Sequence, residues 1–181
     1  MQAVEKKVFT YEDYAHLPEG APYQLINGKL VMSPSPTPTH QRILRSLSFT
    51  LHLFVEEHDL GEILFAPMDV YLSDIDTPQP DILFIAKARL DIIGEKYVKG
   101  APDLVVEILS PSTAYYDLKK KKRLYETSGV KEYWIVDPEA REIEVYTLVE
   151  DRFELFVRKA EQGSVTSKLL AGFSVDLEAV F

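Results

Sequence analysis

The sequence contains no cysteine. This absence excludes a disulfide framework, a thiolate metal site and a cysteine nucleophile, and it is typical of proteins from a reducing compartment. The chain also has no apolar run near the ~18 residues of a membrane span, and its opening MQAVEKKVFTYEDY includes no apolar signal-peptide segment. We therefore expect a cytoplasmic protein that does not contact a membrane.

Positive charge is scarce. Lys and Arg together number 20 against 29 Asp and Glu, which gives a formal net charge of -9. Because Lys and Arg contacts to phosphate supply most non-specific affinity for nucleic acid, this balance excludes a broad electrostatic grip on DNA and leaves only a local basic patch. The length of 181 residues and the 46% hydrophobic content favour one globular domain over residues 1–181.

Several well-known catalytic patterns are missing as well. The chain has no GxGxxG, Walker loop or GxSxG motif, so nucleotide-dependent and serine-hydrolase functions have no support. Its histidines show neither HxH nor HExxH spacing, which makes a zinc site unexpected. His40 stands out because it begins a predicted helix beside the proline-rich loop 34–39, and we interpret it as a capping or packing residue before a catalytic one.

Near the N-terminus, two local patterns predict a short helix and a hairpin. Thr10 and Asp13 resemble a capping box ahead of a helix over 11–17. Asn27-Gly28 lies between two apolar-rich runs and predicts a β-hairpin over 23–33, because this dipeptide suits the tight turns that join paired strands.

The rest of the chain alternates predicted helices and strands. Apolar residues recur at helical spacing over 40–59 and indicate a long amphipathic helix. The later elements are a strand over 62–72 interrupted or bent at Pro67, an extended segment over 81–86, an apolar strand over 103–109, a helix over 113–129, a strand over 131–137, and an antiparallel pair over 142–149 and 153–158.

The order of these elements indicates the fold class. One helix between the strands 103–109 and 131–136 implies a right-handed parallel crossover, while the other neighbours suit antiparallel pairing. We therefore predict an α/β fold leaning to α+β. It has a mixed central β-sheet flanked by helices, an N-terminal β-hairpin and a C-terminal antiparallel hairpin.

Two carboxylates occupy unusual positions in the predicted sheet. Asp81 follows Pro80 at the start of one strand, and Glu107 lies in the middle of the apolar strand 103–109. If the two strands pair, these side chains face each other. An ionised carboxylate in an apolar strand is costly unless it is paired or bound to a cation, and Mg²⁺ suits two such oxygens. The alternatives are a metal site for hydrolysis, or a Glu107 that lies at an edge or pairs with a lysine.

A run of cations, 119-KKKKR-123, follows Glu107 on the next predicted helix. Asp117, Lys121 and Tyr125 share one helix face, so Lys121 is the lysine that can reach a strand-borne site and hold a scissile phosphate. Other cations of the run suit DNA backbone phosphates, and they are Lys119, Lys122 and Arg123. The competing interpretations are a solvated lysine face and a purely structural role for Tyr125.

Taken together, these motifs resemble a known group of nucleases. The segments 80-PD-81 and 107-EIL-109 with the lysine helix are similar to a variant PD-(D/E)xK nuclease core. A longer set of motifs is similar to the Uma-two family of restriction-type endonucleases. It consists of 9-FTYEDYAHLPEG-20, 23-YQLINGKLV-31, 101-APDLVVEILSPST-113, Asp117, Lys121, Tyr125, 129-GVKEYWIVDP-138 and 171-AGFSVDLEAVF-181.

The resemblance implies a divalent-metal site and cleavage of DNA phosphodiester bonds. On this sequence, Asp81 and Glu107 are then the metal ligands for Mg²⁺ or Mn²⁺, with the Ile108 carbonyl as a third oxygen. The wider superfamily has a lysine two residues after the acid, where this chain has Leu109, and the family's pattern moves that lysine to the helix position of Lys121.

A second departure from the family pattern concerns the hairpin. Gln24 stands where the family usually has a glutamate, which keeps a carbonyl oxygen but removes a charge from the site. Asp69 is a further candidate for an outer role in catalysis, and a solvated turn or an ion pair explains it as well.

Two classes of function follow from these observations. In the first, the chain is a Mg²⁺-dependent DNA endonuclease in which Asp81 and Glu107 hold the metal and Lys121 supports the scissile phosphate. In the second, it is a catalytically degenerate nuclease fold that binds nucleic acid or protein, which Gln24 and the acidic composition favour. Because cleavage of a duplex must reach two strands, we expect a homodimer.

Overall fold

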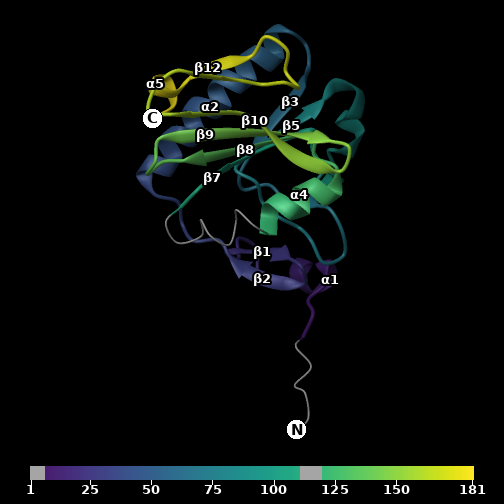
Figure 1. The fold of residues 1–181 in the computed structure, drawn as a ribbon. Coiled ribbons are helices and arrows are strands. Elements are labelled where there is room, and N and C mark those ends of the chain that lie inside the picture. The colour runs from purple at the N-terminus through teal and green to yellow at the C-terminus, as the bar shows by residue number, and fades with distance from the viewer. Residues whose placement is uncertain (1–6, 111–119) are drawn as a thin grey trace.

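The computed structural model describes residues 7–110 and 120–181, and at its centre lies a six-stranded mixed sheet (Figure 1). Its strands are β3 (Gly61–Phe65), β5 (Ile82–Ala86), β7 (Leu104–Ile108), β8 (Glu132–Asp137), β9 (Glu142–Val149) and β10 (Arg152–Ala160). They are arranged in the order β10-β9-β8-β7-β5-β3. Strands β7 and β8 pair in parallel and all other neighbours pair antiparallel, which confirms the predicted parallel connection and the predicted fold class.

Helix α2 (Pro38–Glu57) covers one face of this sheet. It begins at Pro38 and not at His40, because the Thr37 hydroxyl caps the helix by accepting the His40 N–H at 3.2 Å and proline is well suited to the first helical position. Its buried residues are Ile43, Leu44, Leu47, Leu51 and Val55, and they pack against the strand residues Ile63, Ile82, Phe84, Leu104 and Val106. Within residues 7–110 and 120–181, no helix combines the length and apolar character that crossing a bilayer requires.

Helix α4 (Lys122–Ser128) covers the opposite face. Tyr125 is fully buried and packs with Val105 and Tyr133, and the helix ends at Gly129 in the left-handed conformation, with φ of 86°. Every residue of β7 is buried, as its near-continuous apolar sequence predicts for a strand covered on both faces. The segment 111–119, where the predicted helix 113–129 begins, lies outside the described residues.

The predicted N-terminal elements are present. Helix α1 (Tyr11–Ala15) has a complete capping box between Thr10 and Asp13. Strands β1 (Tyr23–Ile26) and β2 (Lys29–Met32) form the expected hairpin, and Asn27 and Gly28 take the positive φ angles of 49° and 65° that a tight type I′ turn requires. This hairpin lies beside α1, below the central sheet in Figure 1.

The predicted strand 62–72 is interrupted around Pro67, which is one of the two outcomes that this proline indicated. It divides into β3 and the short β4 (Val70–Tyr71), which leaves the central sheet and pairs with β6 (Val98–Lys99). The other elements that the sequence patterns missed are η1 (Lys87–Ile92), β11 (Ser164–Thr166), β12 (Ser174–Asp176) and α5 (Leu177–Val180). These elements are too short to show a hydrophobic period.

The C-terminal segment completes the core beneath α2. Its buried apolar residues include Val165, Phe173 and Leu177, which join the same cluster as Trp134. The segment is attached to the sheet by the fully buried carboxylate of Glu132. That carboxylate accepts hydrogen bonds from Trp134 Nε1 at 2.8 Å, Ser167 Oγ at 2.6 Å, and the backbone N–H groups of Lys168 and Leu169 at 2.8 Å. Trp134 itself is fully buried in this core.

A second buried carboxylate, Asp103, joins the loops at the start of β7. It accepts the Ala86 N–H at 2.9 Å and pairs with Lys131 at 2.8 Å and Arg89 at 2.9 Å. Burial alone raises the pKa of Asp103, but the hydrogen bond from Ala86 and the two cations outweigh it and lower the pKa below the usual value. The ionised form of Asp103 therefore stabilises the folded state.

We expect Asp103→Asn to reduce the free energy of unfolding by about 2 kcal/mol at pH 7, because it leaves two cations without their buried partner. The folded pKa is depressed, so the contribution is complete above the unfolded pKa of about 3.9 and is lost as the pH falls through the folded value. Urea denaturation at a series of pH values from 7 downward measures this difference. The exposed Asp151→Asn is the control, and a difference that stays constant on acidification contradicts the assignment.

Candidate active site

Asp81 and Glu107 lie side by side at one end of the central sheet. The antiparallel register of β5 and β7 pairs Ile82 with Val106, and its continuation by one residue places Asp81 opposite Glu107. The Asp81 Oδ2 atom accepts the Ile108 N–H at 2.7 Å. A side-chain oxygen thus takes the position of a backbone acceptor where the strand pair ends, and this bond fixes the direction of the carboxylate.

His40 approaches the same carboxylate from the first turn of α2. Its Nε2 atom lies 3.2 Å from both Asp81 oxygens, and the two side chains are only 12% and 15% exposed. Burial lowers the pKa of His40, but the Asp81 carboxylate outweighs burial, with help from Glu107 and the Ile108 backbone, so the pKa is raised. Of the two roles expected for His40, the capping role was wrong, since Thr37 is the cap, whereas its largely buried ring packs against Asp81.

Glu107 is buried with two partners from the chain that follows it. Lys121 Nζ lies 3.0 Å from each carboxylate oxygen, and the Tyr125 hydroxyl donates to Oε1 at 2.7 Å. Glu107 is 4% exposed, Lys121 is 3% exposed and Tyr125 is fully buried. Of the interpretations left open by the sequence, Glu107 does pair with a lysine, which is Lys121.

The origin of this lysine explains the apolar residue at position 109. Leu109, two residues after Glu107, is buried with Val105 and Tyr133 in the core under α4. The cation comes instead from Lys121, immediately before α4, because α4 packs on the same face of the sheet. Lys121 therefore supplies the positive charge that a lysine at position 109 would otherwise bring.

Gln24 and Asp69 take part in a neighbouring network that is centred on Gln79. Gln24 is 6% exposed, its Oε1 atom accepts the Gln79 N–H at 3.2 Å, and its Nε2 atom donates to Ser33 Oγ at 3.2 Å. Asp69 Oδ1 accepts the Tyr14 hydroxyl at 2.8 Å and Gln79 Nε2 at 2.9 Å. Burial and the Asp69 carboxylate raise the pKa of Tyr14, which keeps its hydroxyl protonated as the donor.

This network holds the segment that leads into Asp81. Gln79 stands two residues before Asp81 and bonds to Gln24 and Asp69 at once. Among the described residues, neither Gln24 nor Asp69 has a hydrogen bond or ion pair with Asp81 or Glu107. Sequence reasoning missed Gln79 and Tyr14; the position of Gln79 in 78-PQPD-81 was the available signal for the former.

The other cations of the lysine run have different environments. Lys122 Nζ lies 3.3 Å from the centroid of the Tyr146 ring on β9, and burial lowers its pKa, with a smaller effect of Arg158. Arg123 is exposed and available to a ligand. Asp117 and Lys119, which were also predicted to belong to the site, lie outside the described residues.

The donors at the sheet end suit a hard cation. In the described part of the chain, no group of three or more His, Asp or Glu side chains is arranged to hold a metal ion. The available donors are oxygens, from Asp81, Glu107 and the Ile108 carbonyl. Mg²⁺ and Mn²⁺ use few carboxylates and complete their coordination with water and substrate oxygens, whereas structural zinc needs four protein ligands. The residues present therefore fit a magnesium or manganese ion.

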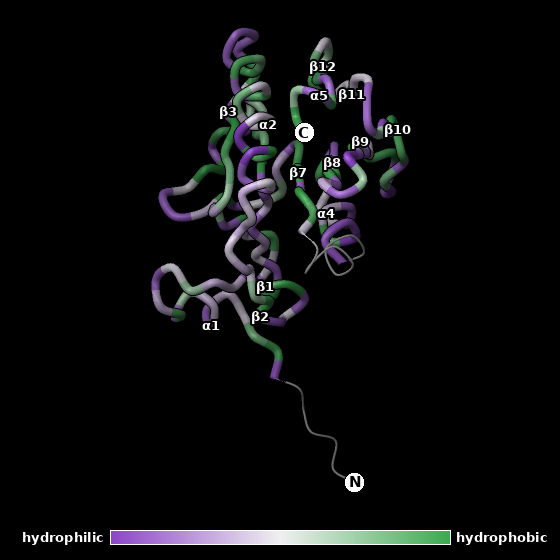
Figure 2. The backbone as a smooth tube through the Cα atoms, turned by 90° about the vertical axis from the view of Figure 1, so that its left-hand side faces the viewer, coloured by the Kyte–Doolittle hydropathy of each residue, from purple (hydrophilic) through white to green (hydrophobic). Residues whose placement is uncertain are grey.

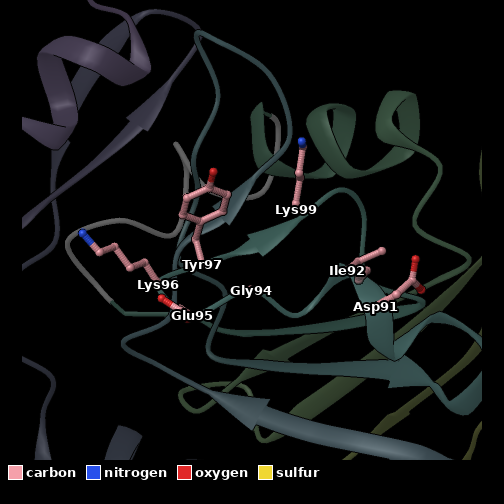
Figure 3. A pocket seen from close by; sticks show the side chains of 7 residues that line it. All are labelled: Asp91, Ile92, Gly94, Glu95, Lys96, Tyr97 and Lys99. Carbon is pink, nitrogen blue, oxygen red and sulfur yellow. The ribbon is translucent and has the colours of Figure 1, made fainter.

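Two surface hollows lie elsewhere on the molecule. One is lined by Asp91, Ile92, Gly94, Glu95, Lys96, Tyr97 and Lys99, around the loop between η1 and β6 (Figure 3). The other is lined by Thr10, Glu12, Asp13 and His16 on α1 and its flanks. Neither hollow includes Asp81, Glu107 or Lys121.

Known proteins resemble this chain over nearly its whole length. The Uma2 (Uma-two) family, described as "Putative restriction endonuclease", matches residues 11–178. An uncharacterised protein from Synechocystis sp. (strain ATCC 27184 / PCC 6803 / Kazusa), sll1609, is 26% identical over 156 residues, which are 84% of this chain and 88% of the relative. The crystal structure of "a putative nuclease belonging to DUF820" from Anabaena variabilis ATCC 29413 has a TM-score of 0.79 at 22% identity, covering 96% of this chain and 97% of the other. The structural likeness shows that the fold is shared.

The pair of Lys121 and Glu107 allows a test of the buried cluster. We expect Lys121→Met to reduce the free energy of unfolding by about 3 kcal/mol, because it leaves a buried carboxylate without its cation. Combining it with Glu107→Gln should recover about 2 kcal/mol of the summed losses, since no unpaired charge then remains. Urea denaturation of both single variants and the double variant gives this coupling. Arg123→Met is the exposed control from the same helix, and strictly additive effects contradict the pairing.

Proposed function

This chain belongs to the Uma2 family, and on that premise we propose that it is an endonuclease that hydrolyses phosphodiester bonds of DNA with a divalent cation. The description of the family and the name of the DUF820 relative support a nuclease-like function. The observation that carries the finer proposal is the cluster at the end of β5 and β7. There Asp81 lies beside Glu107, and Glu107 holds Lys121 in the buried sheet face.

The two carboxylates have the roles of metal ligands in this proposal. Asp81 and Glu107 would hold Mg²⁺ or Mn²⁺ together with the Ile108 carbonyl oxygen. When bound, such a cation supplies a Lewis acid for the phosphate and lowers the pKa of water. The Ile108 N–H keeps Asp81 in its direction and the Tyr125 hydroxyl does the same for Glu107, so both acids are oriented before substrate arrives.

Lys121 is the residue that would meet the negative charge of the reaction. Its Nζ atom contacts both Glu107 oxygens, and the ammonium group has three donors. A preorganised cation in a buried site stabilises charge that develops on a phosphate more strongly than a cation in water. His40 is a positioning residue here, because it contacts both oxygens of Asp81 and restricts that carboxylate.

A binding module without catalysis is the second candidate function. Two observations favour it: Gln24 brings no charge to the site, and the formal net charge of -9 opposes tight binding of DNA. In addition, the Gln24 Oε1 atom is already used by the Gln79 N–H. The pairing of Asp81 with Glu107 favours the enzyme, because a binding module has no need for two adjacent carboxylates at the end of an apolar sheet.

A cleavage assay on plasmid and single-stranded DNA separates these candidates. We expect cutting that requires Mg²⁺ or Mn²⁺ and that falls about 100-fold or more in Asp81→Asn, because this variant keeps an acceptor for the Ile108 N–H but removes the charge. Arg123→Ala, with an intact acidic pair, should lower binding to DNA and leave the metal requirement unchanged. Cutting that persists in Asp81→Asn would exclude the proposed site. Binding of DNA without cutting under any metal would favour the module.

Metal binding can be measured without substrate. We expect calorimetric titration with Mn²⁺ to give one binding event per chain, which weakens about tenfold or more in Glu107→Gln, because hard cations select carboxylate oxygens over amides. The matched control is Glu126→Gln, because the Glu126 carboxylate accepts the Phe153 N–H of β10 and has no hydrogen bond to Asp81 or Glu107 among the described residues. Equal binding by the unmodified chain and Glu107→Gln would place the cation elsewhere.

A further inference from the structure

Helix α2 has two rows of residues at a spacing of four. Ile43, Leu47, Leu51 and Val55 form the buried row that packs on the sheet. Two positions further along, Arg45, Phe49, Leu53 and Glu57 form a second row, which we call the outer row. Two residues correspond to about 200° of rotation around the helix axis, so the outer row lies on the side away from the sheet. All four of its residues are exposed.

The apolar pair at the centre of the outer row is unusual for a helix that already has a buried face. Phe49 is 61% exposed and Leu53 is 49% exposed. They occupy adjacent turns and form one continuous apolar surface, whereas the outer face of such a helix is ordinarily polar. Single exposed apolar residues are common, but an apolar pair with flanking charges has the composition of an interaction site.

The order of residues along the outer row makes it complementary to itself. A cation at one end, Arg45, is followed by two apolar residues and then by an anion, Glu57. Along the helix axis, the midpoint between Arg45 and Glu57 and the midpoint between Phe49 and Leu53 both fall at the level of Leu51. A two-fold axis that is perpendicular to the helix at this level, on its outer side, therefore brings each cation to an anion of an identical row. The same axis brings each apolar residue to an apolar residue.

The charges at the ends of the outer row are available to a partner. Over residues 7–110 and 120–181, neither the Arg45 guanidinium nor the Glu57 carboxylate has an ion-pair partner. The nearby Glu56 differs, since it already lies 3.6 Å from His52 on its own helix. Rows of residues four apart are also the ridges that interlock when two helices pack.

We propose that two copies of this chain form a symmetric dimer in which the outer rows of the two α2 helices pack against each other in antiparallel orientation. Phe49 packs on Leu53 of the partner subunit, and Arg45 forms an ion pair with Glu57 of the partner subunit. Each contact occurs twice, as an isologous interface requires. The charges fix the antiparallel orientation, because a parallel arrangement places like charges opposite each other.

A further apolar side chain lies on the same side of the sheet. Phe65, on the edge strand β3, is 57% exposed and lies on the same strand face as Ile63, which packs beneath α2. Figure 2 shows α2 and β3 together along one side of the molecule, away from β8 and β9. The edge of the sheet therefore adds apolar area to the surface that the outer row provides.

The dimer can be tested with a pair of charge reversals. At micromolar concentration and without DNA or metal, sedimentation equilibrium of the unmodified chain should give a dimer. Arg45→Glu alone and Glu57→Arg alone should each weaken it about tenfold or more, because each variant places like charges opposite each other at both ends. When these two variants are mixed, every end pairs opposite charges again, and a heterodimer should form with the affinity of the unmodified dimer.

A charge reversal at an exposed position away from α2 is the control for this experiment. Glu154→Arg, which reverses an exposed charge on β10, should leave the dimer unchanged, and Phe49→Ser should weaken it. All of these positions are exposed, so folding, checked by circular dichroism, should be retained. A chain that remains monomeric at all concentrations overturns the proposal. A dimer that both single reversals leave intact, or a mixture that does not associate, also overturns it, whatever the cleavage assay gives.

Discussion

The buried negative charge of Glu107 constrains the structure around it. A carboxylate in the middle of an apolar strand is tolerated only with a cation and a donor close by, and the chain supplies both 14 and 18 residues later, as Lys121 and Tyr125. To deliver them, α4 must lie over the sheet face on which Val105 and Glu107 stand, and β8 then joins β7 in parallel. The contacts of Lys121 and Tyr125 with Glu107 therefore contribute both to the parallel β7–β8 connection and to the candidate site.

Much of the architecture could be predicted from local patterns. The hairpin at Asn27, the amphipathic α2 and the parallel crossover each follow from a short-range periodicity or turn signal. Strand pairing then brought Asp81 to Glu107 as expected. The contact of His40 with Asp81 could not be predicted, because 41 residues separate them and no pattern relates a helix start to a distant strand end. The small C-terminal strands were missed because three residues carry no period.

Gln24 shows how an amide can suit a position near an acidic site. It accepts from the Gln79 backbone and donates to Ser33, which requires both an oxygen and an N–H on one side chain. An ionised carboxylate at this position could accept the Gln79 N–H but could not donate a hydrogen bond to Ser33 Oγ. The amide therefore joins the β1–β2 hairpin to the segment that carries Asp81, and its contribution is structural and not ionic.

The hydrogen bond between the Ile108 N–H and Asp81 has an evolutionary consequence. An asparagine at position 81 could accept the same bond, so a descendant of this sequence could lose the charge there and, in the fold, give up only the charge interaction with His40. A change at Glu107 is different, because it would leave Lys121 buried without its anion. Selection for folding alone would thus preserve one acid of the pair and not the other. Among related sequences, an aspartate at position 81 is therefore a better indicator of the proposed metal-dependent activity than a glutamate at position 107.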